Sequence, residues 1–234
     1  MRTTTALAAL VLIAACGERP DRPPDAPGAL PPDVAPAPPV PPPPPEPSKG
    51  GEPGGTDDWR AVASAEDASR LGRLHQAWRL ARAEAEDKGF AAEVEALGPL
   101  VDPNAGLAGQ LQPAPGAYRC RTIKLGSNSP GGLGYLEYPW FRCTVELTPG
   151  GDLVLTKTTG SQRTRGLLYP DTDRRLVFIG AQAWGMDETG WPTYGQMPER
   201  DQIGVFERIG PDRWRLTIPW PRVDSKLEIL ELAK

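Results

Sequence analysis

The residues best suited to binding form one short polar run, which contains Ser161, Gln162, Arg163 and Arg165. Arginine carries a planar fork of N–H donors that suits carboxylates and phosphates, and both groups are common on envelope polymers and lipids. We therefore predict that Arg163, with Ser161 and Gln162, contacts a ligand or a partner. The structural alternative, which is the simpler expectation, is that the arginines of the predicted sheet pair across strands with glutamates on its outer face. That alternative concerns Arg119, Arg121 and Arg142 as well, with Glu137, Glu146 and Glu207 as their partners.

A second candidate is the segment of residues 181–200, which holds many large side chains for a single connection. They are Trp184, Met186, Trp191, Tyr194 and Met197. Long loops often carry function, and aromatic residues and methionine are enriched at recognition surfaces. We predict that Trp184, Trp191 and Tyr194 take part in binding. The alternative is that the segment folds back as a lid on the end of the β structure.

Catalytic chemistry has little support in this sequence. His75 is the only histidine, so a Ser-His-Asp or Cys-His arrangement would depend on that residue alone. We interpret it as a residue at the edge or surface of a helix. The chain has no H-x-x-x-H, C-x-x-C, acidic calcium loop or glycine-rich phosphate loop. Carboxylates at 187–188 and 199–201 are interpreted as solvated loop charges, and we expect no metal site, no cofactor and no enzyme activity.

The first 16 residues have the pattern of an export signal. Arg2 precedes an apolar run of residues 6–15, which is too short to cross a membrane as a helix. The sequence Ile13-Ala14-Ala15-Cys16 resembles a bacterial lipobox. The resemblance implies cleavage after residue 15, lipid chains on Cys16 and stable anchoring in a membrane. Gly17 stands where an aspartate would resemble an inner-membrane retention signal, which favours the periplasmic face of the outer membrane. The alternative is an ordinary leader with a chance cysteine.

Residues 16–56 are predicted to be a disordered linker. Between Gly17 and Pro53 there are 16 prolines and few large apolar side chains, so the segment cannot build a core and favours polyproline II. From residue 57 onward, 22 Lys and Arg stand against 24 Asp and Glu. This near balance argues against nucleic acid as a partner, because phosphate neutralisation needs clustered basic residues.

Residues 57–115 are predicted to be helical and to pack on a sheet. Ser64 and Asp67 have the spacing of a capping box, and Lys88-Gly89 is typical of a helix end, so we predict a helix over residues 65–88. Phe90, Val94 and Leu97 indicate a second, short helix. The first helix has one apolar stripe, formed by Ala68, Leu71, Leu74, Trp78, Ala81 and Ala85.

In residues 116–234 apolar and polar side chains alternate with a period of two, which is typical of half-buried antiparallel strands. The fold class is therefore mainly β with an N-terminal helical segment (α+β). Tight-turn sequences between the runs make neighbours in sequence neighbours in the sheet, so we predict an up-and-down, eight-stranded barrel-like sheet. A two-sheet sandwich is the alternative. The strands are expected near 117–125, 139–147, 152–158, 161–169, 174–180, 202–209, 213–219 and 226–232.

Two cysteines remain if Cys16 carries lipid. The midpoint between Cys120 and Cys143 falls in the turn at Gly131-Gly132, so an antiparallel hairpin centred there would place them opposite one another. Because the periplasm is oxidising, we predict a Cys120–Cys143 disulfide worth about 3 kcal/mol. The alternative is a pair of reduced, buried thiols.

Several separated motifs resemble an uncharacterised family of exported bacterial proteins, known only as a domain of unknown function. They are Tyr118-Arg-Cys-Arg, Tyr138-Pro-Trp-Phe-Arg-Cys, Thr159-Gly-Ser-Gln-Arg, Phe206-Glu-Arg-Ile-Gly and Arg213-Trp-Arg-Leu. The resemblance implies an envelope location and supplies no catalytic residue. A weaker likeness, through the lipobox, the barrel, the Y-x-C start and the Thr159 motif, is to lipid-anchored lysozyme inhibitors.

These observations predict a lipid-anchored envelope protein that is a non-catalytic binding module. Its partners would be the membrane, through the lipid anchor, and an envelope protein or a small amphiphile. The alternatives are a passive structural or assembly factor and a lysozyme-inhibitor-like protein.

Overall fold

A computed structural model describes residues 56–234. The predicted signal peptide, the lipidated Cys16 and the proline-rich linker up to residue 55 lie outside the described residues. The helices are α1 (Ala65–Gly72), α2 (Leu74–Asp87) and α3 (Ala91–Ala96), with 3-10 turns η1 (Trp59–Ala61), η2 (Gly98–Leu100) and η3 (Pro198–Arg200). The strands are β1 (Gly116–Leu125), β2 (Tyr135–Glu137), β3 (Phe141–Leu147), β4 (Leu153–Lys157), β5 (Gln162–Pro170), β6 (Leu176–Trp184), β7 (Asp201–Gly210), β8 (Arg213–Pro219) and β9 (Leu227–Ala233). No helix between residues 56 and 234 has the length and apolar character needed to span a membrane.

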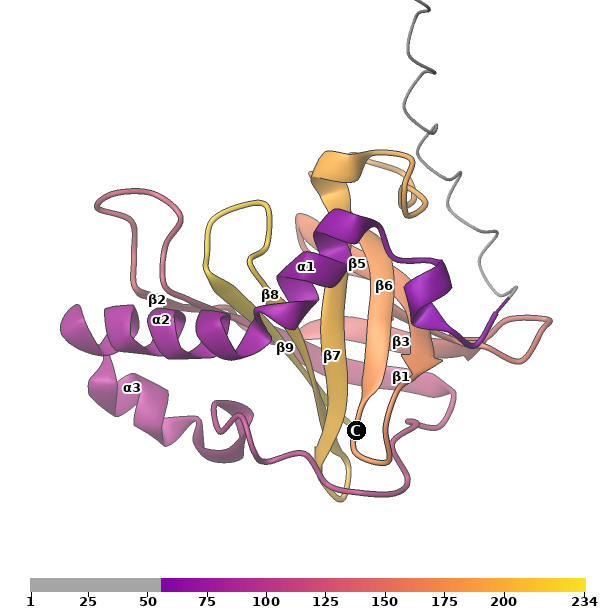
Figure 1. The fold of residues 1–234 in the computed structure, drawn as a ribbon, viewed down its shortest axis with the longest axis horizontal. Helices are drawn as coiled ribbons and strands as arrows, with labels where there is room; N and C mark the ends of the chain where they lie inside the picture. Colours follow the sequence, from indigo (N-terminus) through magenta and orange to yellow (C-terminus); the bar gives the residue numbers. More distant parts are fainter. Residues whose placement is uncertain (1–55) are drawn as a thin grey trace, which may run out of the picture. The chain divides into compact units, whose positions relative to one another are not determined.

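The β domain is a closed antiparallel barrel (Figure 1). From β3 to β9 each strand pairs with the next, and β1 pairs with both β3 and β9. The pairing of β1 with β9 runs from Arg119 opposite Ala233 to Leu125 opposite Leu227 and closes the ring. The predicted up-and-down barrel of eight strands is therefore confirmed, and the barrel rather than the sandwich is the architecture.

One strand was not predicted. The second half of β1 pairs with the short strand β2, in which Glu137 lies opposite Ile123, while its first half pairs with β3. The predicted strand of residues 139–147 begins only at Phe141. Pro139 lies between β2 and β3, and proline interrupts a ladder because it has no N–H to donate.

We predicted one continuous helix over residues 65–88, and this is wrong. The chain leaves helical geometry at Arg73, with φ −99° and ψ 17°, and so forms two helices. Gly72 precedes this break, and glycine is a poor helix former. The break lets α1 contact β7 while α2 contacts β1, β8 and β9, so both helices follow the curved wall (Figure 1). The predicted cap is present, since the Asp67 N–H donates to Ser64 Oγ at 3.1 Å. The predicted short helix is also present as α3.

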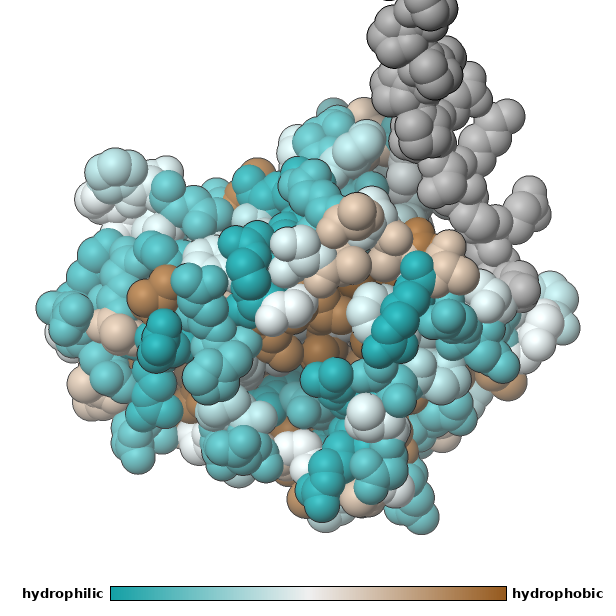
Figure 2. Space-filling model, in the orientation of Figure 1, coloured by the Kyte–Doolittle hydropathy of each residue, from teal (hydrophilic) through white to brown (hydrophobic). Residues whose placement is uncertain are grey.

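Apolar side chains are buried on both sides of the barrel wall, as the alternation of the strands requires. The interior is packed around residues such as Phe178, Phe206 and Leu216, each of them fully buried. Outside the wall, Trp78 and its neighbours on α2 and α3 cover β1 and β9. A third apolar cluster lies outside β4–β7, and its surface beside α1 is visible as an apolar hollow in Figure 2.

Two glycines allow β5 and β6 to approach each other closely. Gly166 lies opposite Gly180, and a Cβ on Gly166 would stand only 2.6 Å from the Gly180 Cα. A side chain at either position would push the strands apart. The missing side chains would point into the barrel, toward Phe178, and the main chain of both residues lines the groove described below.

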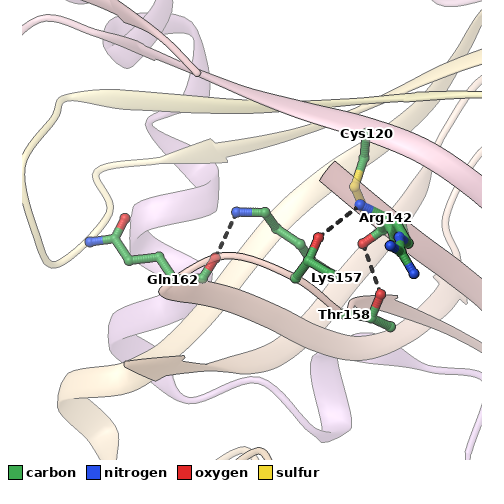
Figure 3. The surroundings of a disulfide bond; sticks show 7 residues. Cys120, Arg142, Lys157, Thr158 and Gln162 are labelled. Carbon is green, nitrogen blue, oxygen red and sulfur yellow. Dashed lines mark hydrogen bonds between the residues drawn. A yellow bond between two sulfur atoms is a disulfide. The ribbon is translucent and has the colours of Figure 1, made fainter. Parts of the chain in front are cut away.

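The Cys120–Cys143 disulfide is present, with its Cα atoms 5.9 Å apart (Figure 3). The predicted register was wrong by two residues, because Cys143 lies opposite Tyr118 and Cys120 lies opposite Phe141. Period-two geometry still points both cysteines into the barrel, where they pair diagonally. Both are buried in the interior core.

Candidate functional site

A groove on the outer wall of the barrel brings together several of the predicted binding residues. It is a cavity of about 220 Å³ over β5 and β6, bordered by the segment after η1 and by the connection between β6 and β7. Its floor is mostly apolar, and Arg165, Trp191 and Tyr194 line it with Thr148 and Thr193. The apolar lining residues are Val62, Val154, Leu167, Tyr169 and Ile179.

Trp191 and the two predicted arginines form one stacked group at this groove. Arg163 and Arg165 are two residues apart on β5 and therefore leave the same face of the strand. Their guanidinium carbons lie 5.3 Å and 5.5 Å from the centre of the Trp191 ring, which is cation–π distance. The indole N–H of Trp191 is buried without a hydrogen-bond partner among residues 56–234.

The structural alternative for the arginines holds for some of them only. Arg121 pairs with Glu137 as predicted, and the predicted partner Glu207 pairs instead with Arg215, at 2.8 Å. Arg119 and Arg142 form no ion pair within residues 56–234. Neither Arg163 nor Arg165 forms an ion pair with a carboxylate of the described residues. Arg163 instead donates to main-chain carbonyls of Gly185 and Glu188, and so holds the connection between β6 and β7.

That connection is fixed at two further points. The Trp184 N–H donates to the Glu188 carboxylate at 2.5 Å, and Glu188 also pairs with Arg200. These hydrogen bonds lower the pKa of Glu188, and the backbone N–H of Trp184 makes the largest contribution. The interpretation of residues 187–188 and 199–201 as solvated loop charges is wrong for Asp201, which is buried on β7 and accepts from the Gly195 N–H at 3.0 Å, whereas Asp187 and Glu199 are exposed.

Tyr194 joins the connection to α1. Its hydroxyl accepts from the Ser64 N–H at 2.9 Å and donates to Asp67, which also pairs with Arg70. Asp67 is fully buried and Arg70 is nearly so. Tyr194, which forms one wall of the groove, is thus hydrogen-bonded to Asp67 in the first turn of α1, 127 residues earlier in the chain.

The remaining predicted residues lie elsewhere. Ser161 and Gln162 line a small cavity at the mouth of the barrel interior. Trp184 lines another small cavity beside Arg200, and its indole N–H donates to Gln182 at 2.9 Å. The predicted set is therefore split among three places. His75 is exposed on α2, and the described residues contain no group of three or more potential metal ligands.

Three buried charged residues at the barrel mouth were not predicted. Lys124, Lys157 and Glu228 are each about 5% exposed and occupy inward positions of β1, β4 and β9. Burial lowers the pKa of Lys157 to about 8 against the opposing effect of Glu228, and burial raises the pKa of Glu228. The sequence holds a signal for these residues, because each is a charged residue at a strand position where the alternation calls for an apolar one.

The fold and the groove define a class: a small closed β barrel with helices packed on its outer wall and a small, arginine-rimmed groove. The chain belongs to the family described as a domain of unknown function (DUF4893), which matches residues 59–232. No curated protein and no solved structure matches it. The predicted relation to a family of unknown function is therefore confirmed.

Proposed function

We propose that this protein is a non-catalytic binding module of the bacterial cell envelope, and that its outer groove binds a small amphiphile with an anionic head group. The observation that carries the proposal is the position of Arg165, which lines an apolar groove and has no carboxylate partner within the described part of the chain. An anionic head group would supply that partner. The apolar floor would cover the tail of the ligand.

The size of the groove limits the ligand. Ligand pockets for drug-sized molecules usually measure roughly 300–1,000 Å³. A groove of about 220 Å³ is smaller, so it suits one short alkyl chain rather than a complete diacyl lipid. The hydroxyl of Thr193 borders the groove and offers a further hydrogen bond to a head group, whereas the hydroxyl of Thr148 already donates to Asp152 at 3.2 Å.

Export and anchoring belong to this proposal. The lipobox-like sequence ending at Cys16 supports cleavage and lipidation, and the Cys120–Cys143 disulfide fits an oxidising compartment. We expect mass spectrometry of the chain from a bacterial envelope to detect lipid on Cys16. A Cys16→Ala variant should leave the membrane fraction, and an unlipidated chain that stays there would contradict the anchor.

Titration of the full chain with octyl phosphate, followed by calorimetry, tests the groove. We expect saturable binding that Arg165→Met weakens about tenfold, because a hydrogen bond to a charged group is lost. Arg119→Met is the matched control, since Arg119 also stacks on a tryptophan, Trp140 at 4.4 Å, but outside the groove. If both variants lose affinity for octyl phosphate equally, the binding is due to general attraction between charges and not to the groove.

An uncharged amphiphile separates the two parts of the proposal. Octyl glucoside should bind more weakly than octyl phosphate, and Arg165→Met should not affect it. No binding of either compound would overturn the amphiphile proposal. That result would favour the alternatives of a passive envelope factor or a lysozyme-inhibitor-like protein, neither of which needs a ligand in this groove.

A further inference from the structure

A second cavity lies inside the barrel, at the mouth near Lys124, and it is separate from the outer groove. It measures about 110 Å³ and is lined by Thr122, Tyr138, Phe141, Lys157, Gln162 and Glu228, together with Ser161. Figure 3 shows Lys157 reaching from β4, beside Cys120, toward the main chain of Gln162. Two of the cavity's lining residues are strand partners of the cysteines, because Phe141 lies opposite Cys120 and Lys157 lies opposite Cys143.

The two lysines at this cavity differ in how well they are partnered. Lys124 Nζ donates to Gln162 Oε1 and to Asp224 Oδ2, both at 2.7 Å. Lys157 Nζ donates to the Gln162 carbonyl at 2.8 Å and lies 4.0 Å from the centre of the Phe141 ring. An ammonium group has three donors, so Lys157 retains two that could face a ligand.

Glu228 is the acid of the cavity, and among residues 56–234 it forms an ion pair but no hydrogen bond through Oε2. Its side chain is only 7% exposed, and its Oε2 has no hydrogen-bond partner in the described part of the chain. The nearest cation is Lys124, whose Nζ stands 3.9 Å from Oε2, beyond hydrogen-bond distance. On the other side of Glu228, Arg200 and Arg222 are paired with Glu188 and Glu66.

This arrangement leaves one buried cation and one buried acid that do not satisfy each other. Lys124 lies between two carboxylates, Asp224 at 2.7 Å and Glu228 at 3.9 Å, whereas Lys157 has no carboxylate within 4.0 Å among residues 56–234. Burying unsatisfied polar and charged groups is costly, so folding alone does not explain why both side chains face this cavity. A ligand that accepts hydrogen bonds and carries one negative charge would satisfy both.

We propose that the cavity binds a small monocarboxylate, which accepts a hydrogen bond from Lys157 Nζ and shares one proton with Glu228 Oε2, the atom that has no hydrogen-bond partner within the described residues. Burial favours the protonated form of Glu228, because it raises the pKa of that carboxyl group. Two facing carboxyl groups in a buried cavity share one proton, because both cannot be ionised there, so the single remaining negative charge lies beside the ammonium group of Lys157. Thr122 and Ser161 border the cavity with further hydroxyls.

The volume selects the smallest members of this class. About 110 Å³ is well below the roughly 300–1,000 Å³ of pockets for drug-sized ligands, so the cavity suits a ligand of few non-hydrogen atoms. Acetate or formate meets this limit, whereas a long alkyl chain does not. A dianion such as sulfate would also leave an uncompensated negative charge beside Glu228.

The test uses the full chain and acetate as the probe, with binding followed by calorimetry and by NMR line broadening of ¹³C-acetate. We expect saturable binding with a Kd on the order of 1 mM, as befits a ligand of so few atoms. Lys157→Met should weaken it about tenfold or more. Lys234→Met, which removes an exposed lysine from the last residue of the chain, should leave acetate binding unchanged.

Two comparisons keep the proposal falsifiable should Lys157→Met fail to fold. In the unaltered chain, octanoate and sulfate should not compete with acetate, whereas formate should. Glu228→Gln, which keeps an N–H donor, should retain acetate binding, and Glu228→Met should weaken it about tenfold. Absence of acetate binding, or equally good binding of octanoate at this site, would overturn the proposal without affecting the octyl phosphate test of the outer groove.

Discussion

Arg215 on β8 donates a hydrogen bond to the main-chain carbonyl of Leu100, at the end of η2, with an N–O distance of 3.1 Å. The same nitrogen donates to the carbonyls of Pro99 at 3.0 Å and Asp102 at 2.6 Å, while Nε and Nη2 donate to Glu207. Arg215 is fully buried between the barrel wall and the helical segment. One side chain thus satisfies the carbonyls that end the helical segment and fastens them to the barrel.

Replacing Arg215 should therefore destabilise the protein strongly. We expect Arg215→Met to lower the free energy of unfolding by about 3–5 kcal/mol, because it leaves three carbonyls and the Glu207 carboxylate without their donor. Urea denaturation measures the change. Arg213→Met is the control, since that side chain is 39% exposed and its partner Glu231 keeps Arg121; we expect a loss below about 1 kcal/mol. Similar losses in the two variants would contradict the fastening role.

Glu84 should make stability depend on pH. Burial alone would raise its pKa, but hydrogen bonds from Lys226 and Lys88 outweigh burial and lower the pKa from 4.5 to about 2. A lowered carboxyl pKa means that the stabilisation is present above the unfolded value near 4.5 and is lost as the pH falls toward 2. We expect the ionised Glu84 side chain to stabilise the fold by about 2 kcal/mol at pH 7, after allowance for its partial exposure.

Urea denaturation of Glu84→Gln at several pH values checks this prediction. The difference from the unaltered chain should be largest at pH 7 and shrink between pH 4.5 and 2. Glu86→Gln serves as the control, because Glu86 is 40% exposed and forms only an i,i+4 pair with Arg82. A difference for Glu84→Gln that does not change with pH would refute the assignment.

The disulfide should stabilise the barrel. Cys120 and Cys143 are 23 residues apart, and closing a loop of this length is worth about 3 kcal/mol in the chain-entropy model. The double variant Cys120→Ala/Cys143→Ala should lose at least that amount, since both sites lie in the interior core. Thermal unfolding with and without a reductant measures it, and an unchanged Tm of the reduced chain would count against the prediction.

Tyr194 should hold the groove wall. Tyr194→Phe removes the hydroxyl that bonds the Ser64 N–H and the buried Asp67, so we expect a loss of about 1–3 kcal/mol and faster amide exchange near residues 185–200. Tyr169→Phe is the control, because Tyr169 lines the same groove without making these two bonds. Equal protection of the connection in Tyr194→Phe and the unaltered chain would show that other contacts hold it.

The sequence by itself determined the local elements of this protein. The stripe from Ala68 to Ala85 specified the buried helix face, and the alternation in residues 141–147 and 213–219 specified two strands. Hydrophobic periodicity is a property of neighbouring residues, which is why it can be read without a fold. The cysteine pair was also found this way, although its register was two residues off, because the turn alone does not fix where β1 and β3 begin to pair.

Only the tertiary structure decided closure and the two cavities. The pairing of β1 with β9 depends on the twist and stagger accumulated over all the strands between them, which no local pattern contains. The same closure brings Lys124, Lys157 and Glu228 from three strands to one mouth of the barrel. Trp191 meets Arg165 because Tyr194 fastens its connection to α1. Residue types and their spacing thus name the candidates for binding, whereas contacts between distant segments decide which of them share a site.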